Sequence, residues 1–270
     1  HKEYRRQRQM CIRDRIMPQS VVISPLSRAM SLNNPVLISR WLLMMLATQM
    51  FIHHENRIPV TGPVLVVSNH RSFMDAPLLM MALGRPIHFA CHYYMGQVPL
   101  LRDLVKLLGA FPLAQSDGKH LAFFRQANNF LQAGKAVGVF PEGGTPMVKF
   151  SEAGEIGDFH RGFAHLAWRS PLENLIVLPV AIAAFEEQVI SSLLPLKLLS
   201  VFDPSEPLFD QPGWHPMVIY HRVNVMIGKP YYIVSSKRQE YQGKYAKIFI
   251  NEFSDQIRGE IAEMLRQGCY

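Results

Sequence analysis

Short apolar runs alternate with amphipathic stretches from residue 63 to the end of the chain. Short apolar runs bounded by turn residues are typical of buried strands, and apolar positions three or four apart are typical of helices. The pattern predicts strands over residues 64–67, 87–90, 110–113, 136–140, 175–182 and 221–227 and helices over residues 76–83, 99–108, 120–133, 163–169 and 245–265. Strands that alternate with helices predict an α/β fold, with a mostly parallel central sheet flanked by helices.

The longest apolar stretch of the chain precedes this region, at residues 35–52. As a single helix it would be about 27 Å long, slightly short of the roughly 30 Å hydrocarbon core of a bilayer. Arg40 and the adjacent Trp41 both lie inside the stretch. This favours a helix at the membrane interface over one that spans the bilayer. A buried helix packed on the rest of the fold is the alternative interpretation.

Composition supports contact with a membrane and argues against nucleic acid as a partner. Hydrophobic residues make up 49% of the chain, and the mean hydropathy of +0.04 is high for a globular protein but low for one with several membrane spans. Residues 1–15 hold six Lys or Arg and two acidic residues, so they contribute +4 of the net charge of +7. The remaining chain has no comparable basic run, and we expect no nucleic-acid partner.

Two polar motifs follow predicted strands. Residues 68–75 read S-N-H-R-S-F-M-D, which places His70 and Asp75 five positions apart on a strand-to-helix turn. A carboxylate within hydrogen-bond reach of an imidazole can fix its tautomer, while the other ring nitrogen takes a proton from a hydroxyl. The alternative is an ordinary capped turn with Asp75 as the helix N-cap.

The second motif, A-V-G-V-F-P-E-G-G, occupies residues 136–144. It is a buried strand that runs into a carboxylate and two glycines, at the strand end where α/β sheets bind ligands. Glycine allows the backbone to approach a ligand closely. The alternative is a tight turn with a solvated Glu142.

Together these motifs resemble the glycerolipid acyltransferase family, typified by lysophosphatidate acyltransferases. That family shows N-H-x-S-x-x-D, a G-x-F-P block, F-P-E-G and a strand ending in a V-P-V-like turn, in this order. The matching blocks here stand at residues 69–75, 109–113, 140–143 and 177–182, and residues 157–167 resemble the helix before the last strand.

The resemblance implies O-acyl transfer from acyl-CoA or acyl carrier protein to the hydroxyl of a lysophospholipid, in phospholipid biosynthesis. It makes His70 the general base and Asp75 its orienting partner. It places Glu142 and Gly143 at the acceptor pocket and Pro179 at the acyl site. The oxyanion is expected to be bound by backbone N–H groups or a nearby basic side chain. No cofactor and no metal are expected, although the pairs His88/His92 and His160/His165 have spacings that metal sites use.

The chain departs from the family where phosphate would be bound. His92 stands where the family usually has a Lys, and Gln115 stands where its second block usually ends in Arg. The third block continues as Gly-Thr-Pro at residues 144–146, in place of the usual Thr-Arg-Ser. Gln cannot supply the charged, bidentate contact that Arg makes with phosphate. Lysophosphatidate is therefore not expected to be strongly preferred as the acceptor.

Three regions are expected along the chain. Residues 1–31 are a basic or artefactual segment expected to be disordered, residues 32–58 contain the membrane-associating helix, and residues 59–270 form the acyltransferase domain. Membrane lipids, the lysolipid acceptor and the acyl donor are the expected partners, at the cytoplasmic face of a membrane. A catalytically silent lipid-binding relative is the alternative function.

Overall fold

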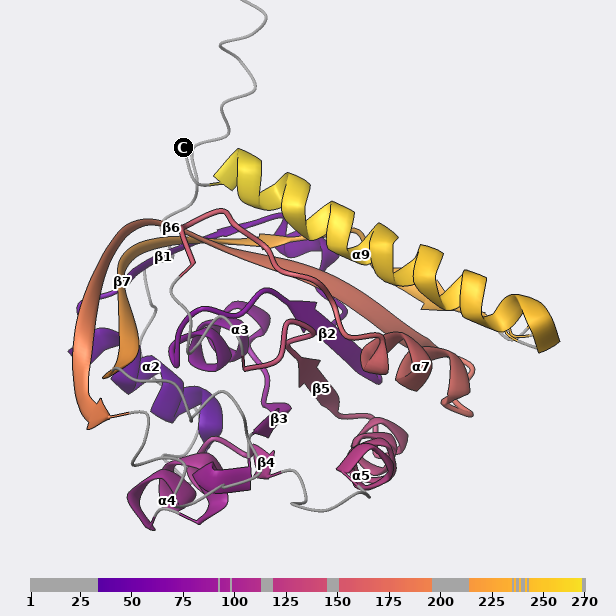
Figure 1. Cartoon of the computed structure of the whole chain (residues 1–270), viewed down its shortest axis with the longest axis horizontal. Helices are drawn as coiled ribbons and strands as arrows, with labels where there is room; N and C mark the ends of the chain where they lie inside the picture. The colour runs from indigo at the N-terminus through magenta and orange to yellow at the C-terminus, as the bar shows by residue number, and fades with distance from the viewer. Residues whose placement is uncertain are drawn as a thin grey trace, which may run out of the picture.

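The computed structural model describes residues 34–91, 93–97, 99–112, 119–144, 151–195, 214–234, 236, 238, 241 and 243–268. The expectation for residues 1–31 lies outside the described residues. Within the described part, the chain forms a central sheet with helices on both faces (Figure 1). The expected α/β class is confirmed.

The central sheet has eight strands in the order β1-β7-β6-β2-β5-β3-β4, and β8 pairs with β6 beside this path. The strands are β1 (Gln49–His53), β2 (Val64–Ser68), β3 (Ile87–Cys91), β4 (Phe111–Pro112), β5 (Ala136–Val139), β6 (Leu175–Pro195), β7 (Trp214–Ile227) and β8 (Tyr231–Ile233). Pairing is parallel from β6 through β2, β5 and β3 to β4, and also between β1 and β7. β7 and β8 run antiparallel to β6.

Helices cover the two faces of this sheet and enclose two apolar cores. They are α2 (Pro35–Met45), α3 (Asp75–Leu83), α4 (Pro99–Leu107), α5 (Lys119–Gln132), α7 (Gly162–Arg169) and α9 (Ala246–Gly268). One core joins the sheet to α2 and α3, and the other joins it to α5, α7 and α9. All residues of β2 are buried, because this strand lies at the centre of the sheet with side chains in both cores.

The predicted single helix over residues 35–52 is wrong beyond Met45. The helix ends there, Ala47 has a positive φ of 52°, and Gln49–His53 form β1 in parallel register with β7. Thr48 supports the turn, since its hydroxyl donates to the carbonyl of Tyr220 at 3.0 Å. A short apolar run satisfies both helix and strand patterns, so the pairing with β7 decides the outcome.

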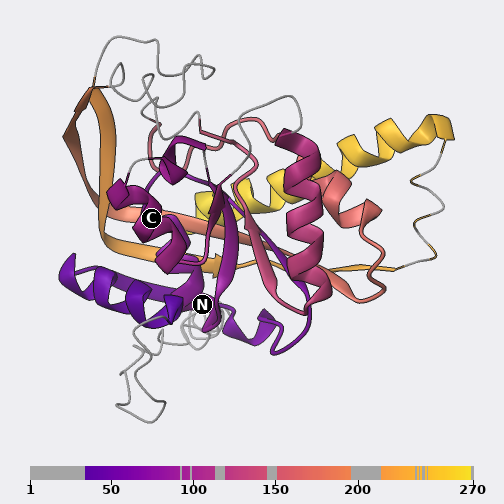
Figure 2. The same cartoon turned by 90° about the horizontal axis from the view of Figure 1, so that it is seen from below.

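The antiparallel pair β6–β7 is longer than the predicted strands over residues 175–182 and 221–227. β6 continues to Pro195 and β7 begins at Trp214, with register shifts between Ala184 and Glu187. The two strands bend together away from the sheet, and their ends project at one edge of the molecule (Figure 2). Among the described residues, no helix is long and apolar enough to cross a bilayer.

Candidate active site

The turn between β2 and α3 is anchored to the neighbouring strand by Asn69. Its buried side chain donates to the carbonyl of Ile182 at 3.0 Å and accepts from the backbone N–H of Ile182 at 2.8 Å. Both halves of the amide thus continue the pairing of β2 with β6 one residue past the end of β2. The chain leaves the sheet here in a fixed direction, with His70 next.

The imidazole of His70 and the carboxylate of Asp75 are brought together by this turn. The distance from His70 Nδ1 to Asp75 Oδ2 is 2.9 Å, and the side chains are 19% and 1% exposed respectively. The same Oδ2 accepts the backbone N–H groups of Arg71 at 2.7 Å and Ser72 at 2.8 Å. The turn therefore holds the carboxylate on Nδ1, so that Nε2 is the nitrogen left to act as a base.

Asp75 is not the N-cap of α3, because it is already the first residue of the helix and Met74 occupies the cap position. Ser72 supports the helix start instead, since its hydroxyl accepts from the N–H of Met74 at 3.1 Å. The same hydroxyl donates to the carbonyl of Val218 on β7 at 2.6 Å. Asp75 is thereby free to turn its carboxylate back toward His70.

Glu142 is 6% exposed, so the alternative of a solvated Glu142 is wrong. Its Oε1 accepts the backbone N–H of His70 at 3.1 Å, and its Oε2 accepts that of Gly157 at 2.6 Å. Burial raises the pKa of Glu142, although the hydrogen bonds from Gly157 and His70 oppose the shift. The carboxylate thus joins the His70 turn to the loop that precedes α7.

Aromatic packing fixes the plane of the His70 ring. The ring stacks on Phe140 with centroids 4.1 Å apart and planes 11° apart, and Phe140 stacks in turn on Phe89. Gly143 follows at φ +68°, and an added Cβ would lie 3.4 Å from the His160 ring. The F-P-E-G block therefore supplies both a wall and a hydrogen-bond acceptor to the His70 turn.

Arg71, the basic residue next to His70, is held by other groups. Its guanidinium donates to both carboxylate oxygens of Glu187, at 2.8 and 2.9 Å, and to the carbonyl of Ser151. Burial alone would lower the pKa of Arg71, but the hydrogen bonds and charge of Glu187 reverse this, and the pKa is raised. Arg71 thus ties the turn to β6, and both carboxylate oxygens of Glu187 already occupy its guanidinium.

The remaining predicted site residues are spread differently. Pro179 is buried within β6 beside Val67, and an added Cβ at Gly228 would lie 3.1 Å from its Cβ. The structure therefore brings together His70, Asp75, Glu142 and Gly143, and Pro179 lies on β6, the strand beside β2. His92 and Gln115 lie outside the described residues.

The histidine pairs have separate surroundings. His88 Nδ1 lies 2.8 Å from the carbonyl oxygen of Gly109, and its ring stacks on Phe130. His160 borders Gly143, whereas His165 Nδ1 lies 2.9 Å from the hydroxyl of Tyr241. In the part of the chain that the structure describes, no group of three His, Cys, Asp or Glu side chains is placed to hold a metal ion.

Four contacts of the site were not predicted from the sequence. They are made by Asn69, Ser72, Phe140 and Gly157. Asn69 and Ser72 lie within the N-H-x-S-x-x-D block, so their positions in the motif beside His70 could have indicated a role in the site. The contact between Gly157 and Glu142 joins residues 15 apart across a loop, and no spacing pattern in the chain indicates it.

Comparisons with known proteins agree with this geometry. A family model described as "Acyltransferase" matches residues 49–183, which is half of the chain and contains His70, Asp75 and Glu142. The fold is similar to the crystal structure of the 1-acyl-sn-glycerophosphate (LPA) acyltransferase PlsC from Thermotoga maritima. The TM-score is 0.55 at 16% sequence identity, and the alignment covers 87% of this chain and 78% of that one. No curated protein sequence matches the chain. The chain belongs to the acyltransferase family that its four sequence blocks indicated.

Proposed function

We propose that this protein transfers a fatty acyl group from a thioester donor, acyl-CoA or acyl carrier protein, to the hydroxyl of a lysophospholipid. The proposal rests above all on the 2.9 Å contact between His70 Nδ1 and Asp75 Oδ2. An imidazole that is oriented by a buried carboxylate in this arrangement deprotonates hydroxyl groups in acyl-transfer enzymes. Membership of the acyltransferase family supports the same reaction type.

The chemistry follows from the tautomer that Asp75 selects. While Nδ1–H of His70 donates a hydrogen bond to Asp75, Nε2 takes the proton of the acceptor hydroxyl. The oxygen of that hydroxyl attacks the thioester carbonyl at the same time. The tetrahedral intermediate then collapses, the C–S bond breaks, and the imidazolium returns its proton to the leaving thiolate. Asp75 stabilises the imidazolium between these two proton transfers.

Glu142 is assigned a positioning role in this reaction. Its two oxygens hold the backbone on both sides of the site, at His70 and Gly157. Each oxygen already accepts a hydrogen bond from a backbone N–H. We therefore assign the side chain to orienting the backbone around His70 rather than to exchanging protons with the substrate. The acceptor would enter beside it, next to Gly143.

The acceptor is proposed to be a lysolipid whose phosphate is not strongly selected. Both positions where the family usually carries arginine hold other residues, Gln115 and the Gly-Thr-Pro run at residues 144–146. Arg71 does not replace them, because Glu187 already occupies its guanidinium. We therefore expect lysophosphatidate and lysolipids with larger or neutral headgroups to be used at comparable rates.

Contact with the membrane is assigned to α2. Ser39 and Leu43 are buried on the side that packs toward α3, whereas Trp41 and Met45 are 61% and 83% exposed. An exposed aromatic and a flexible thioether next to each other fit the interfacial region of a bilayer. We propose that this face holds the enzyme at the cytoplasmic surface of a membrane.

A panel of lysolipid acceptors, incubated with labelled acyl-CoA or acyl-loaded carrier protein, tests the proposed function. The expected result is acylated product with one donor class and several acceptors, abolished in His70→Ala. Gln115→Arg should raise the preference for lysophosphatidate by at least about tenfold, because one charged contact contributes roughly 1.5–3 kcal/mol. Bound lipid without turnover for any donor would identify a silent lipid-binding protein instead.

A further inference from the structure

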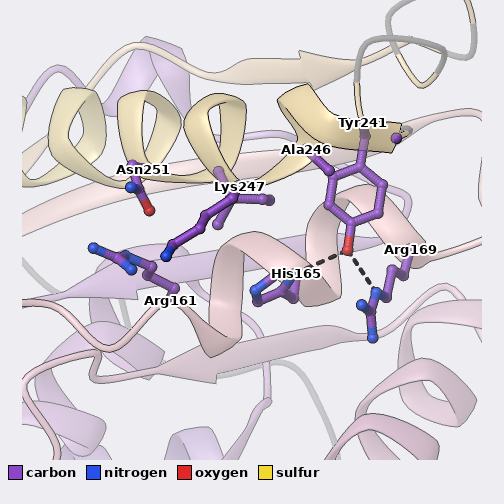
Figure 3. A pocket seen from close by; sticks show the side chains of 9 residues that line it. Arg161, His165, Arg169, Tyr241, Ala246, Lys247 and Asn251 are labelled. Carbon is purple, nitrogen blue, oxygen red and sulfur yellow. Dashed lines mark hydrogen bonds between the residues drawn. The ribbon is translucent and has the colours of Figure 1, made fainter.

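A cavity lies between α7 and α9, and its lining includes neither His70 nor Asp75 nor Glu142. It has a volume of about 400 Å³, which is within the range of small-ligand sites. Figure 3 shows the polar side chains that face it from α7, from α9 and from the segment before α9. These are Arg161, His165, Arg169, Tyr241, Lys247 and Asn251.

Helical spacing explains why these side chains converge. Arg161, the N-cap of α7, is followed by His165 and Arg169 at intervals of four residues along the helix, and Lys247 and Asn251 are four apart on α9. Each set therefore lies along one face of its helix. The two helices pack against each other through the apolar core, which places the two polar rows opposite one another. Figure 3 shows Arg161 and Lys247 approaching each other from the two helices.

The charge in this cavity is one-sided. Among the described residues that line it, Arg161, Arg169 and Lys247 are permanent cations and none is a carboxylate. Some other arginines of the described chain are paired with acids, as Arg71 is with Glu187 and Arg258 is with Asp158, whereas no carboxylate lines this cavity. Three cations gathered around one hollow repel each other, and an anion between them would relieve that repulsion.

Tyr241 orders two of these groups. Its hydroxyl accepts from Nε of Arg169 and lies 2.9 Å from Nδ1 of His165, and both contacts are visible in Figure 3. Burial, Arg169 and Arg161 lower the pKa of His165, which favours the neutral ring. A neutral His165 that accepts a hydrogen bond from the Tyr241 hydroxyl on Nδ1 carries its own proton on Nε2. Its Nε2–H is then a further hydrogen-bond donor in the cavity.

We propose that this cavity binds a phosphate ester through Arg161, Arg169 and Lys247, with Asn251 and His165 as additional donors. Arginine forks match the oxygens of phosphate, and a lysine adds a point charge. The site shares no lining residue with His70, Asp75 and Glu142. The same chemistry is offered by a soluble phosphate ester, such as the nucleotide part of coenzyme A, and by the headgroup of an acidic phospholipid.

Binding measurements on the full chain distinguish these two sources. Titration calorimetry with coenzyme A probes the soluble ligand. Sedimentation with vesicles of phosphatidylcholine, with and without phosphatidic acid, probes the lipid headgroup. We expect Arg161→Gln combined with Arg169→Gln to weaken one of these by at least about tenfold. Raising the salt concentration should weaken binding of the native chain more than that of the variant.

Arg125→Gln is the matched control, since Arg125 is an exposed arginine on α5 outside the cavity. It should leave binding of both probes unchanged. If the double variant does not fold, as judged by circular dichroism, Lys247→Gln and Tyr241→Phe replace it, because Lys247 is exposed and phenylalanine keeps the ring. The proposal is overturned if folded cavity variants bind coenzyme A and acidic vesicles as tightly as the native chain. These assays involve no acyl transfer, so a loss of binding in the cavity variants can be measured without turnover at His70.

Discussion

The turn after β2 and helix α2 depart in opposite ways from the distribution found in most proteins, in which polar side chains are exposed and large apolar ones are buried. The turn and the two residues that flank it bury polar groups, namely Ser68, Asn69, Arg71, Ser72 and Asp75, whereas α2 exposes apolar ones, namely Trp41, Met44 and Met45. Buried polar groups are retained where hydrogen bonds satisfy them, and exposed apolar groups are retained where something covers them. Hydrogen bonds from neighbouring strands and loops satisfy most polar groups of the first region, although Asp75 Oδ1 has no partner among the described residues. The second region needs a partner to cover its apolar side chains. Substitutions in the turn should therefore lower the rate of acyl transfer, whereas substitutions in α2 should weaken binding to the membrane.

The largest effect is expected from His70→Ala. Removing the base should lower kcat by roughly 10²–10⁴-fold, since general-base catalysis contributes about that much. The ring is partly exposed and no strand hydrogen bond depends on it, so circular dichroism and the melting temperature should be close to native. A folded variant with near-native turnover would remove His70 from the mechanism.

Asp75→Asn should be the next largest, with kcat reduced by roughly 10²-fold. Asparagine can still accept from the N–H groups of Arg71 and Ser72, but it lacks the charge that stabilises the imidazolium of His70. The nitrogen NMR shifts of His70 should report a change of tautomer in the variant. An unchanged tautomer together with native kcat would show that the 2.9 Å contact serves the fold alone.

Glu142→Gln should reduce activity by about tenfold and change its pH dependence. The amide nitrogen must face one of two backbone N–H groups, of His70 or Gly157, and a buried donor without an acceptor costs about 1–3 kcal/mol. Burial raises the pKa of Glu142, so the native carboxylate gains a proton at a higher pH than an ordinary Glu. Activity should therefore be complete above that pKa and fall as the pH drops through it.

The pH profile of the variant provides the check on Glu142. Gln does not titrate, so the part of the acid limb that belongs to Glu142 should vanish from the profile of kcat against pH. A variant that keeps the whole native acid limb would assign that limb to another group.

The smallest effect is expected in α2, where Trp41→Ser combined with Met45→Ser should weaken partition into phosphatidylcholine vesicles about fivefold. Turnover of a short-chain, water-soluble acceptor should be unchanged. Leu121→Ser, at an exposed leucine on α5, is the matched control. Point substitutions are preferable to deleting residues 1–51, because that deletion would remove three residues of β1 that pair with β7. Equal partition of all three proteins would place the membrane contact elsewhere.

Local patterns predicted the parts of the fold that depend on neighbouring residues. The strand β2, the helix after it and the approach of His70 to Asp75 follow from five to twelve consecutive residues, and periodicity and spacing describe such segments well. The helices predicted over residues 76–83, 99–108, 120–133 and 163–169 match the observed α3, α4, α5 and α7 closely. The four motif blocks added the order in which strands and site residues occur.

Contacts between distant residues were the part that the sequence could not predict. Asn69 bonds to Ile182 across 113 positions and Arg71 to Glu187 across 116, and neither pair carries a spacing signal. The extent of α2 was missed for a related reason, since only the pairing of residues 49–53 with β7 shows that they form a strand. His92 and Gln115 stay predictions.

The two hydrogen bonds between Asn69 and Ile182 have a consequence for folding kinetics. These two residues lie 113 positions apart, and Glu142 reaches His70 from 72 residues away, so the site closes only when the loops between them have been ordered. Closing such long loops is slow compared with forming helices and hairpins. During refolding, helical signal should thus return before enzymatic activity. A chain still emerging from the ribosome cannot assemble its catalytic turn until β6 has been synthesised.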